Sequence, residues 1–273
     1  MYNYSLFQWM MFFFVYCFFG WCIESTIVSI SKRQLVNRGF LRIPMLPLYG
    51  TGAVLILFLT IPVRENIIAV YLVGLIGATV LEYITGMIME SLFKMKYWDY
   101  SHHRFQLHGR ICLTSSLFWG VLSVALMESI HPPIEHWILS LNQTVVSVGV
   151  CITACLMFTD TIVSARAALD LAKVLEHLSA AREEIERLGL QLDELREAAQ
   201  QQIEDIREGK DKLKEHMEEM KKQLSELSTA RESEIAHLGF FKSGLLKGHP
   251  TAYSKKFNLT LRELKERMYT KKR

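Results

Sequence analysis

Long apolar runs in the first 165 residues constrain the fold more than any other feature of the chain. A helix needs about 20 consecutive apolar residues to cross a bilayer. Runs that approach this length predict spans at Leu6–Ile30, Pro47–Val63, Ile67–Phe93, Cys112–Ile130 and His136–Val163. Because helices satisfy their own backbone groups in lipid, the runs predict an all-α polytopic bundle of about five transmembrane helices, with residues 1–165 as the transmembrane domain.

Basic residues in the links predict how this bundle is oriented. The links after spans one and three carry four Lys or Arg residues each, whereas the link after span two has only Arg64 and the link after span four has none. Lys and Arg are enriched in cytoplasmic loops. We therefore expect a multi-pass protein of the cytoplasmic membrane, surrounded by membrane lipids, with its N-terminus outside and its C-terminus in the cytoplasm.

Residues 166–235 carry the periodicity of a coiled coil. Apolar residues from Val174 to Ala199 recur at alternating steps of four and three. The spacing shifts at Ile203, which predicts a stutter, and then continues to Leu227 with Lys210 as its one polar member. This pattern predicts a long cytoplasmic coiled-coil helix, continuous with span five, that forms a parallel homodimer. The alternative is a solvated single helix with ion pairs along its surface.

Residues 236–273 form a basic tail, with ten Lys or Arg residues against two Glu. Asn258–Met268 predicts a short amphipathic helix, whose basic residues suit anionic lipid headgroups. A solvated tail is the alternative. The sequence contains no aromatic-interleaved platform or groove-reading motif, so nucleic acid is not an expected partner.

The third predicted span carries carboxylates on a face of small residues. The residues that recur every four positions are Gly74, Ala78, Glu82, Gly86 and Glu90. Small residues let helices approach closely, so this face is expected to point into the bundle. Ionisable side chains at such depth are costly unless they are paired, and they are functional candidates by default.

Two loops on the predicted cytoplasmic side add polar and aromatic side chains near these carboxylates. They are NRGFLRIPMLPLYGTG, Asn37–Gly52, and the stretch MKYWDYSHHRFQLHGRICL, Met95–Leu113. Irregular backbone at membrane depth is tolerated where it lines a cavity. We therefore predict an inward-facing binding pocket formed by Glu24, Asn37, Arg38, Glu82, Glu90, Trp98, Asp99, Tyr100 and Arg110. The alternatives are structural pairs between the carboxylates and the loop arginines, and an interfacial belt of aromatic anchors.

The same residues carry a resemblance to a known family. The motifs are GWCIE (Gly20–Glu24), NRGFL (Asn37–Leu41), PLYGTG (Pro47–Gly52), EYITG (Glu82–Gly86) with Glu90, WDYS (Trp98–Ser101), and GRICL (Gly109–Leu113) with Trp119 and Gly120. Together they resemble the bacterial ABC transporter permease family of the CmpB type over about Phe19–Gly120. The segments LLKGHP and LRELKERM in the tail extend the resemblance. It implies a substrate-translocating membrane subunit.

The residues leave three functions open, of which transport is the leading prediction. The chain has no G-x-x-x-x-G-K-[ST] loop, so a permease of this kind would use ATP through a separate ATPase subunit. The alternative is a membrane-anchored scaffold or sensor that acts through its coiled coil. An intramembrane enzyme is the weakest reading, because no nucleophile–base arrangement or H-E-x-x-H motif supports it. No cofactor or metal is expected, and HPPIEH, His131–His136, is interpreted as a turn between spans four and five.

Overall fold

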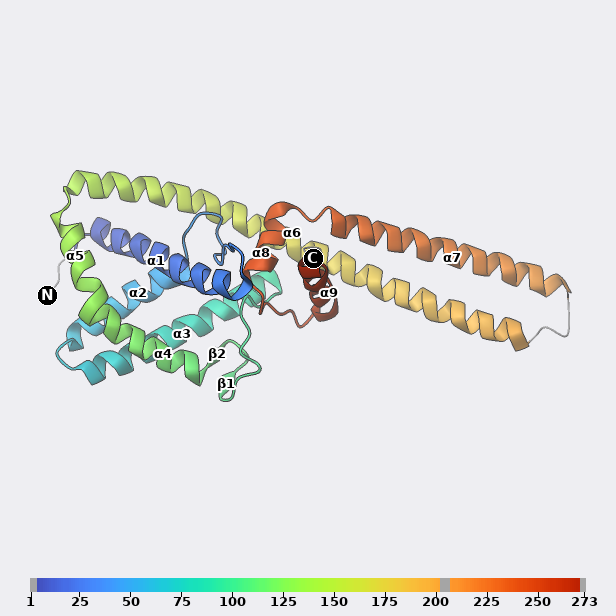
Figure 1. Ribbon diagram of the computed structural model, residues 1–273, viewed down its shortest axis with the longest axis horizontal. Coiled ribbons are helices and arrows are strands. Elements are labelled where there is room, and N and C mark those ends of the chain that lie inside the picture. The colour runs from blue at the N-terminus through green and yellow to red at the C-terminus, as the bar shows by residue number, and fades with distance from the viewer. Residues whose placement is uncertain (1–3, 202–206, 271–273) are drawn as a thin grey trace. The chain divides into compact units, whose positions relative to one another are not determined.

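The computed structural model describes residues 4–201 and 207–270, which form two compact units (Figure 1). One unit, here called the membrane unit, comprises Met1–Leu169 with Gly244–Lys255. The other, here called the hairpin unit, comprises Asp170–Ser243 with Lys256–Arg273. In the described part of the chain the only strands are β1 (Gln106–Leu107) and β2 (Ile111–Cys112), which pair antiparallel, so the predicted all-α class is confirmed.

The membrane unit contains most of the apolar helices. They are α1 (Leu6–Lys32), α2 (Pro47–Thr60) with the 3-10 turn Ile61–Val63, α3 (Ile67–Phe93), α4 (Leu113–Ala125), a π-helical turn (Leu126–Ile130), α5 (His131–Ser140) and the first part of α6 (Gln143–Gln201). In the described residues, four helical segments are long and apolar enough to cross a membrane: Leu6–Lys32, Ile67–Phe93, Leu113–Ser140 and Gln143–Glu197. Pro47–Val63 is a shorter apolar helix, so one of the five predicted spans falls below the usual length.

Local capping explains where the first spans begin and end. Ser5 and Gln8 form a capping box at the start of α1, and the side chain of Asn66 accepts hydrogen bonds from the backbone of Ile68 and Ala69 at the start of α3. Arg33 and Lys94 end α1 and α3 in the left-handed conformation, with φ of 51° and 55°. These boundaries agree with the predicted spans to within a few residues.

The predicted boundary between spans four and five was wrong. Leu113–Ser140 continues through the π-helical turn into α5, and α6 begins at Gln143 rather than at His136. The prolines after His131 lie at the first positions of α5, directly after the π-helical turn. HPPIEH is therefore helical, and the turn lies at Leu141 and Asn142, where Asn142 Oδ1 caps α6 by accepting from the Thr144 amide at 2.8 Å.

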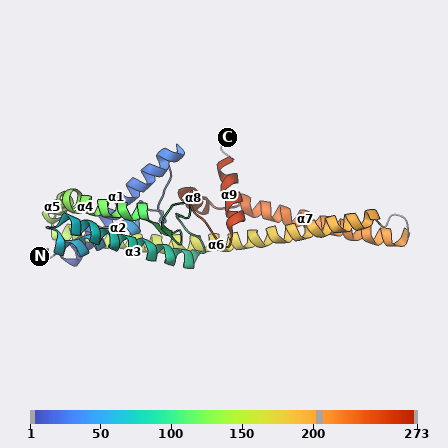
Figure 2. The ribbon, with the colours of Figure 1, turned by 90° about the horizontal axis from the view of Figure 1, so that it is seen from below.

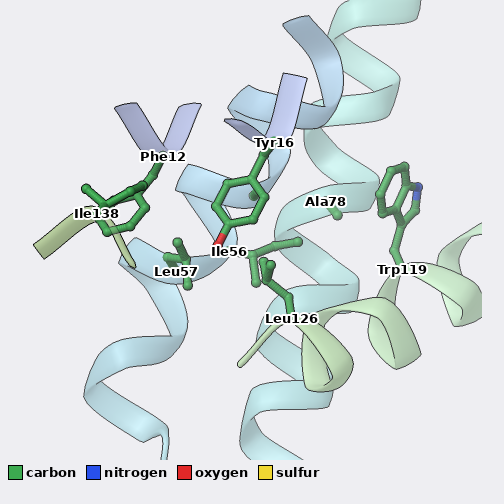
Figure 3. Packing of buried hydrophobic residues seen from close by; sticks show 9 residues of the cluster. Phe12, Tyr16, Ile56, Leu57, Ala78, Trp119, Leu126 and Ile138 are labelled. Carbon is green, nitrogen blue, oxygen red and sulfur yellow. The ribbon is translucent and has the colours of Figure 1, made fainter. Parts of the chain in front are cut away.

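The core of the membrane unit joins the apolar faces of α1, α2, α3 and the segment from α4 to α5. Figure 3 shows its labelled members, Phe12, Tyr16, Ile56, Leu57, Ala78, Trp119, Leu126 and Ile138. Small residues set the spacing, since a Cβ added to Gly74 would lie 2.1 Å from Ser123 Oγ on α4. Gly74, Ala78, Glu82 and Gly86 are buried, as predicted for the inward face of α3, whereas Glu90 on the same predicted face is only half-buried.

The hairpin unit differs from the single long helix that the heptad pattern predicted. Helix α6 ends at Gln201 and α7 (Arg207–Ala236) runs back beside it (Figures 1 and 2). Leu188 and Leu192 of α6 form one buried cluster with Met220 of α7. Heptad spacing does not distinguish a partner in a second chain from one further along the same chain, and closing a hairpin costs little loop entropy. The apolar residues of α6 therefore pack against those of α7 in the same chain.

Two parts of the coiled-coil prediction are not resolved by this packing. The predicted stutter at Ile203 lies outside the described residues, as does the side chain of Lys210. The parallel homodimer stays a prediction, because no second chain is described. What the structure establishes is that Leu188, Leu192 and Met220 are buried without a second copy.

The tail contributes α8 (Phe240–Gly248) and α9 (Asn258–Thr270), and α9 matches the predicted amphipathic helix. Within the hairpin unit, Thr260 Oγ1 lies 2.9 Å from Ser179 Oγ of α6. Glu263 pairs with arginines of all three helices, Arg182 at 3.9 Å, Arg231, and Arg267 at 3.0 Å. Leu261 and Leu264 are buried within the protein, whereas Leu259 is 60% exposed. Binding of this helix to lipid headgroups remains a prediction.

Candidate functional site

A cavity of about 300 Å³ lies in the membrane unit, between the helices and the two loops that the sequence singled out. Its walls come from α1, α2, α3 and α4, from the loops after α1 and α3, and from a segment near the C-terminus. The lining residues are Glu24, Arg38, Phe40, Leu46, Pro47, Leu48, Tyr49, Glu82, Thr85, Met89, Tyr97, Trp98, Tyr100, Ser115, Phe118, Trp119 and His249.

Glu82 is the most deeply buried acid in this wall, with 5% of its surface exposed. Its Oε2 accepts a hydrogen bond from Trp119 Nε1 at 2.9 Å and one from Ser115 Oγ at 3.4 Å. Its Oε1 accepts from the Tyr100 hydroxyl at 3.2 Å. These donors are all neutral, so they orient the carboxylate without neutralising its charge.

Glu24 is held by residues from α2 and from the loop after α1. The Tyr49 hydroxyl donates to Glu24 Oε1 at 2.7 Å, and Arg38 Nε lies 3.7 Å from Oε2. Tyr49 fits here because Gly20, one turn before Glu24, leaves space for its side chain: a Cβ on Gly20 would lie 2.3 Å from Tyr49 Cβ. Gly20 of the GWCIE motif thus leaves room for Tyr49 of PLYGTG, and Glu24 of the same motif accepts the hydrogen bond of that tyrosine.

Burial shifts the pKa values of three loop side chains that line the cavity, Arg38, Tyr97 and Tyr100. Burial lowers the pKa of the Arg38 guanidinium, and the neighbouring Glu24 carboxylate opposes this shift. Because the ordinary value is so high, Arg38 stays charged. Burial raises the pKa of the Tyr97 and Tyr100 phenols, and the nearby Glu82 carboxylate raises that of Tyr100 further. Both phenols therefore keep their protons at neutral pH, and Tyr100 acts as a donor to Glu82.

Asn37 shapes the loop after α1 and is not one of the residues that line the described cavity. Its Oδ1 accepts from Trp21 Nε1 at 2.7 Å and from the Gly39 amide at 2.9 Å, while its Nδ2 donates to the Leu41 carbonyl at 3.0 Å. The same loop is tied to α6, because Asp160 Oδ2 accepts from the Arg42 amide at 2.8 Å. Asn37 therefore positions the loop that carries Arg38 into the wall.

Glu90, Asp99 and Arg110 likewise organise the loop after α3. Arg110 Nη2 and Nε both donate to Glu90 Oε2, at 2.8 and 3.0 Å, and the Trp98 indole donates to the Arg110 carbonyl at 2.9 Å. Asp99 Oδ1 accepts from Ser101 Oγ at 2.6 Å. Gly109 has a φ of 68°, and a Cβ there would lie 2.4 Å from Asp99 Oδ1. Glu90 and Arg110 thus match the structural pair that was the alternative interpretation.

The segment Gly244–Lys255, here called the return segment, completes the cavity wall although it follows the hairpin in the chain. Its Tyr253 pairs antiparallel with Lys96, through backbone hydrogen bonds of 2.7 and 3.0 Å. Ser254 Oγ donates to the Lys94 carbonyl at 2.7 Å. His249 is buried beside Tyr97, with ring centroids 4.8 Å apart. The return segment therefore holds His249 at the cavity by contacts to the loop after α3.

Of the nine predicted site residues, the structure brings five into the cavity wall: Glu24, Arg38, Glu82, Trp98 and Tyr100. The site analysis of the sequence missed Tyr49, Tyr97, Ser115, Trp119 and His249. Tyr49 and Trp119 belong to motifs that carried the family resemblance, and His249 belongs to LLKGHP. Those motifs were the signal that could have identified them.

Comparison with known proteins places this arrangement in a family. The sequence profile of the family described as "Putative ABC-transporter type IV" matches residues 11–165, which is more than half of the chain. No curated protein and no solved structure matches. The match includes every cavity residue except His249. The chain therefore belongs to this family of ABC-transporter-related membrane proteins.

Proposed function

We propose that the protein is the permease-like membrane subunit of a transport system and that the cavity around Glu82 binds its substrate. The observation that carries the proposal is the placement of Glu82. A charged side chain within a spanning helix is costly, and its usual settings are a bundle interior or a pathway for substrate. Glu82 lies in the wall of a cavity, with its carboxylate oriented by neutral donors.

We further propose that the cavity faces the cytoplasm. It is bordered by the two loops that follow α1 and α3, and these loops carry most of the basic residues of residues 1–165. Such loops are typically cytoplasmic. In this proposal the N-terminus lies outside, and both the hairpin unit and the C-terminus lie inside.

The family membership supports a separate ATPase as a partner, because the chain has no phosphate-binding loop of its own. A homodimer is the simplest assembly that would provide enough spanning helices for a pore. In this scheme the protein binds the substrate, and the partner supplies the energy from ATP.

A second candidate role is that of a membrane-anchored scaffold, and the hairpin unit favours it. Helices α6 and α7 bury their seam against each other, while their remaining faces carry charged side chains such as Arg187, Glu184, Lys221 and Glu218 that pair along the surface. A surface of this kind is suited to recruiting a protein partner.

Native mass spectrometry of the full chain in mild detergent separates the two roles. We expect the wild type to retain a small molecule that Glu82→Gln loses, because the substitution removes the buried charge but keeps the side-chain volume. Glu65→Gln, which makes the same change at an exposed site between α2 and α3, should retain the molecule. An empty wild type, or equal retention by Glu82→Gln, would contradict the transport site.

A further inference from the structure

The charges in the cavity wall do not balance. Among the described lining residues, two carboxylates, Glu24 and Glu82, face one guanidinium, Arg38. Arg38 lies 3.7 Å from Glu24, whereas no described Lys, Arg or His nitrogen lies within 4.0 Å of the Glu82 carboxylate. His249, the other basic side chain in the wall, approaches the Leu245 carbonyl through Nδ1 at 2.9 Å. Glu82 is therefore the acidic side chain of the wall that has no basic partner among the described residues.

The rest of the wall is rich in aromatic rings. Seven of the seventeen lining residues are Phe, Tyr or Trp. Ring faces attract cations, and ammonium groups are recognised by aromatic residues together with a counter-charge. Anions are disfavoured by the same ring faces and by Glu82. The combination therefore selects for positive charge.

The size and donor set of the cavity favour an organic cation over a metal ion. A volume of about 300 Å³ lies at the lower end of the range for small-molecule sites. Ca²⁺ takes six to eight oxygen ligands. In residues 4–201 and 207–270, no three His, Cys, Asp or Glu side chains are grouped closely enough to hold a metal ion. The apolar rings instead suit a ligand with carbon substituents around its charge.

One further group in the wall lacks a partner. Tyr97 is 2% exposed, and its hydroxyl makes no hydrogen bond within the part of the chain that the structure describes. A buried hydroxyl without a partner destabilises the folded state, because it has lost its hydrogen bonds to water. Because Tyr97 lines the cavity, a ligand that carries a hydrogen-bonding group beside its cationic centre could satisfy this hydroxyl.

We propose that the cavity binds a small organic cation, an ammonium with apolar substituents, with Glu82 as its counter-charge and Trp98, Tyr100 and Trp119 among the rings around it. This inference rests on the proposed function, since it names the chemical class of the substrate.

The test compares choline with its neutral analogue, in which a quaternary carbon replaces the ammonium nitrogen. Both are titrated calorimetrically into the full chain in mild detergent. Choline should bind at least about tenfold more tightly than the neutral analogue, because a cation over aromatic ring faces is favoured most strongly when it is desolvated. This comparison is made on the wild type, so it does not depend on whether a variant folds.

Variants locate the binding. Glu82→Gln should weaken choline binding at least about tenfold, and Trp98→Leu should weaken it while leaving the carboxylate in place. Glu65→Gln should bind like the wild type. Choline bound no better than the neutral analogue, or equally by Glu82→Gln, would overturn the cation assignment. A neutral or anionic molecule retained by the wild type and lost from Glu82→Gln in native mass spectrometry would also overturn it, but would leave the transport site standing.

Discussion

Trp119 Nε1 on α4 donates a 2.9 Å hydrogen bond to Oε2 of Glu82 on α3, so the deepest carboxylate of the membrane unit is held by a neighbouring helix. The ring of Trp119 also lies 5.6 Å from that of Tyr49, whose hydroxyl donates to Glu24. Trp119 thus binds Glu82 directly through its indole N–H, and its ring packs against Tyr49, the hydrogen-bond donor to Glu24.

Trp119→Phe tests the indole hydrogen bond, because it keeps an aromatic ring and removes the donor. The substitution removes one hydrogen-bond donor from the buried Glu82 carboxylate. This loss should lower the free energy of unfolding by about 1–3 kcal/mol. The measurement is thermal denaturation in detergent. Trp137→Phe is the control, since Trp137 is 49% exposed and should tolerate the change. Equal stability of Trp119→Phe and the wild type would contradict a significant role for this bond.

Gly248→Ala tests the docking of the return segment. A Cβ at Gly248 would lie 2.4 Å from the Asn37 carbonyl oxygen, so the backbone would have to move, at a cost of about 1–3 kcal/mol. We expect faster hydrogen exchange at Lys96 and Tyr253, because the amide of each donates to the carbonyl of the other when the return segment is docked.

Gly244→Ala is a matched control in the same segment, because a Cβ there meets no atom within 4 Å. It should leave the exchange at both amides unchanged. Unchanged exchange in Gly248→Ala as well would mean that the return segment is not held against the loop after α1.

Two nearby leucines of α6 should differ in how much they stabilise the hairpin unit. Leu192 is buried in the cluster with Met220, whereas Leu190 is 63% exposed. Leu192→Lys should destabilise the hairpin by about 2–3 kcal/mol, because it buries an unpaired charge. Leu190→Lys should have little effect. Urea unfolding followed by circular dichroism measures the difference, and similar losses in both variants would contradict the packing of α6 against α7.

The packing of α9 against α6 and α7 should weaken at low pH. A hydrogen bond from Arg267 lowers the pKa of the exposed Glu232 carboxyl, and a bond from Lys256 does the same for Glu176. A carboxyl whose pKa is lower in the folded state stabilises that state above its unfolded value of about 4.5, and this contribution is lost as the pH falls through the folded value.

Hydrogen-exchange protection factors for α9, which correct for the intrinsic effect of pH, should therefore decrease below about pH 4.5. Because both pairs lie at the surface, high salt should reduce the effect. Glu232→Gln should decrease the dependence on pH, whereas Glu234→Gln, two residues further along α7, should preserve it. Protection that is constant between neutral pH and pH 3, a value about one unit below the ordinary range, would contradict this role for the pairs.

The sequence predicted the parts of the fold that depend on local pattern. Ile67–Phe93 matched α3 because an Asn cap and an apolar run define it, and its small residues indicated the buried face that carries Glu82. The helical course of HPPIEH (His131–His136) was missed because prolines normally interrupt a helix, whereas here they follow a π-helical turn and begin α5. Local pattern could not identify this arrangement.

The hairpin and part of the site could not be predicted from the sequence, because they depend on long-range contacts. The spacing of Leu188 and Leu192 indicated a seam, but it contained no information that the partner was Met220 of the same chain. His249 reaches the cavity through long-range contacts such as the pairing of Tyr253 with Lys96, more than 150 positions earlier in the chain. Glu90 and Asp99 were predicted as site residues from their charge, but Glu90 of α3 pairs with Arg110 of the loop and Asp99 accepts from Ser101, so both hold the loop in place.

The most direct test of the account is an electron cryo-microscopy structure of the wild-type protein purified in its native lipids. We predict non-protein density in the cavity, within hydrogen-bonding or ionic contact of the Glu82 carboxylate and beside the rings of Trp98 and Tyr100. The account would be contradicted by an empty cavity in which a lysine or arginine of the chain pairs with Glu82, since the buried carboxylate would then have a structural partner and no need of a ligand.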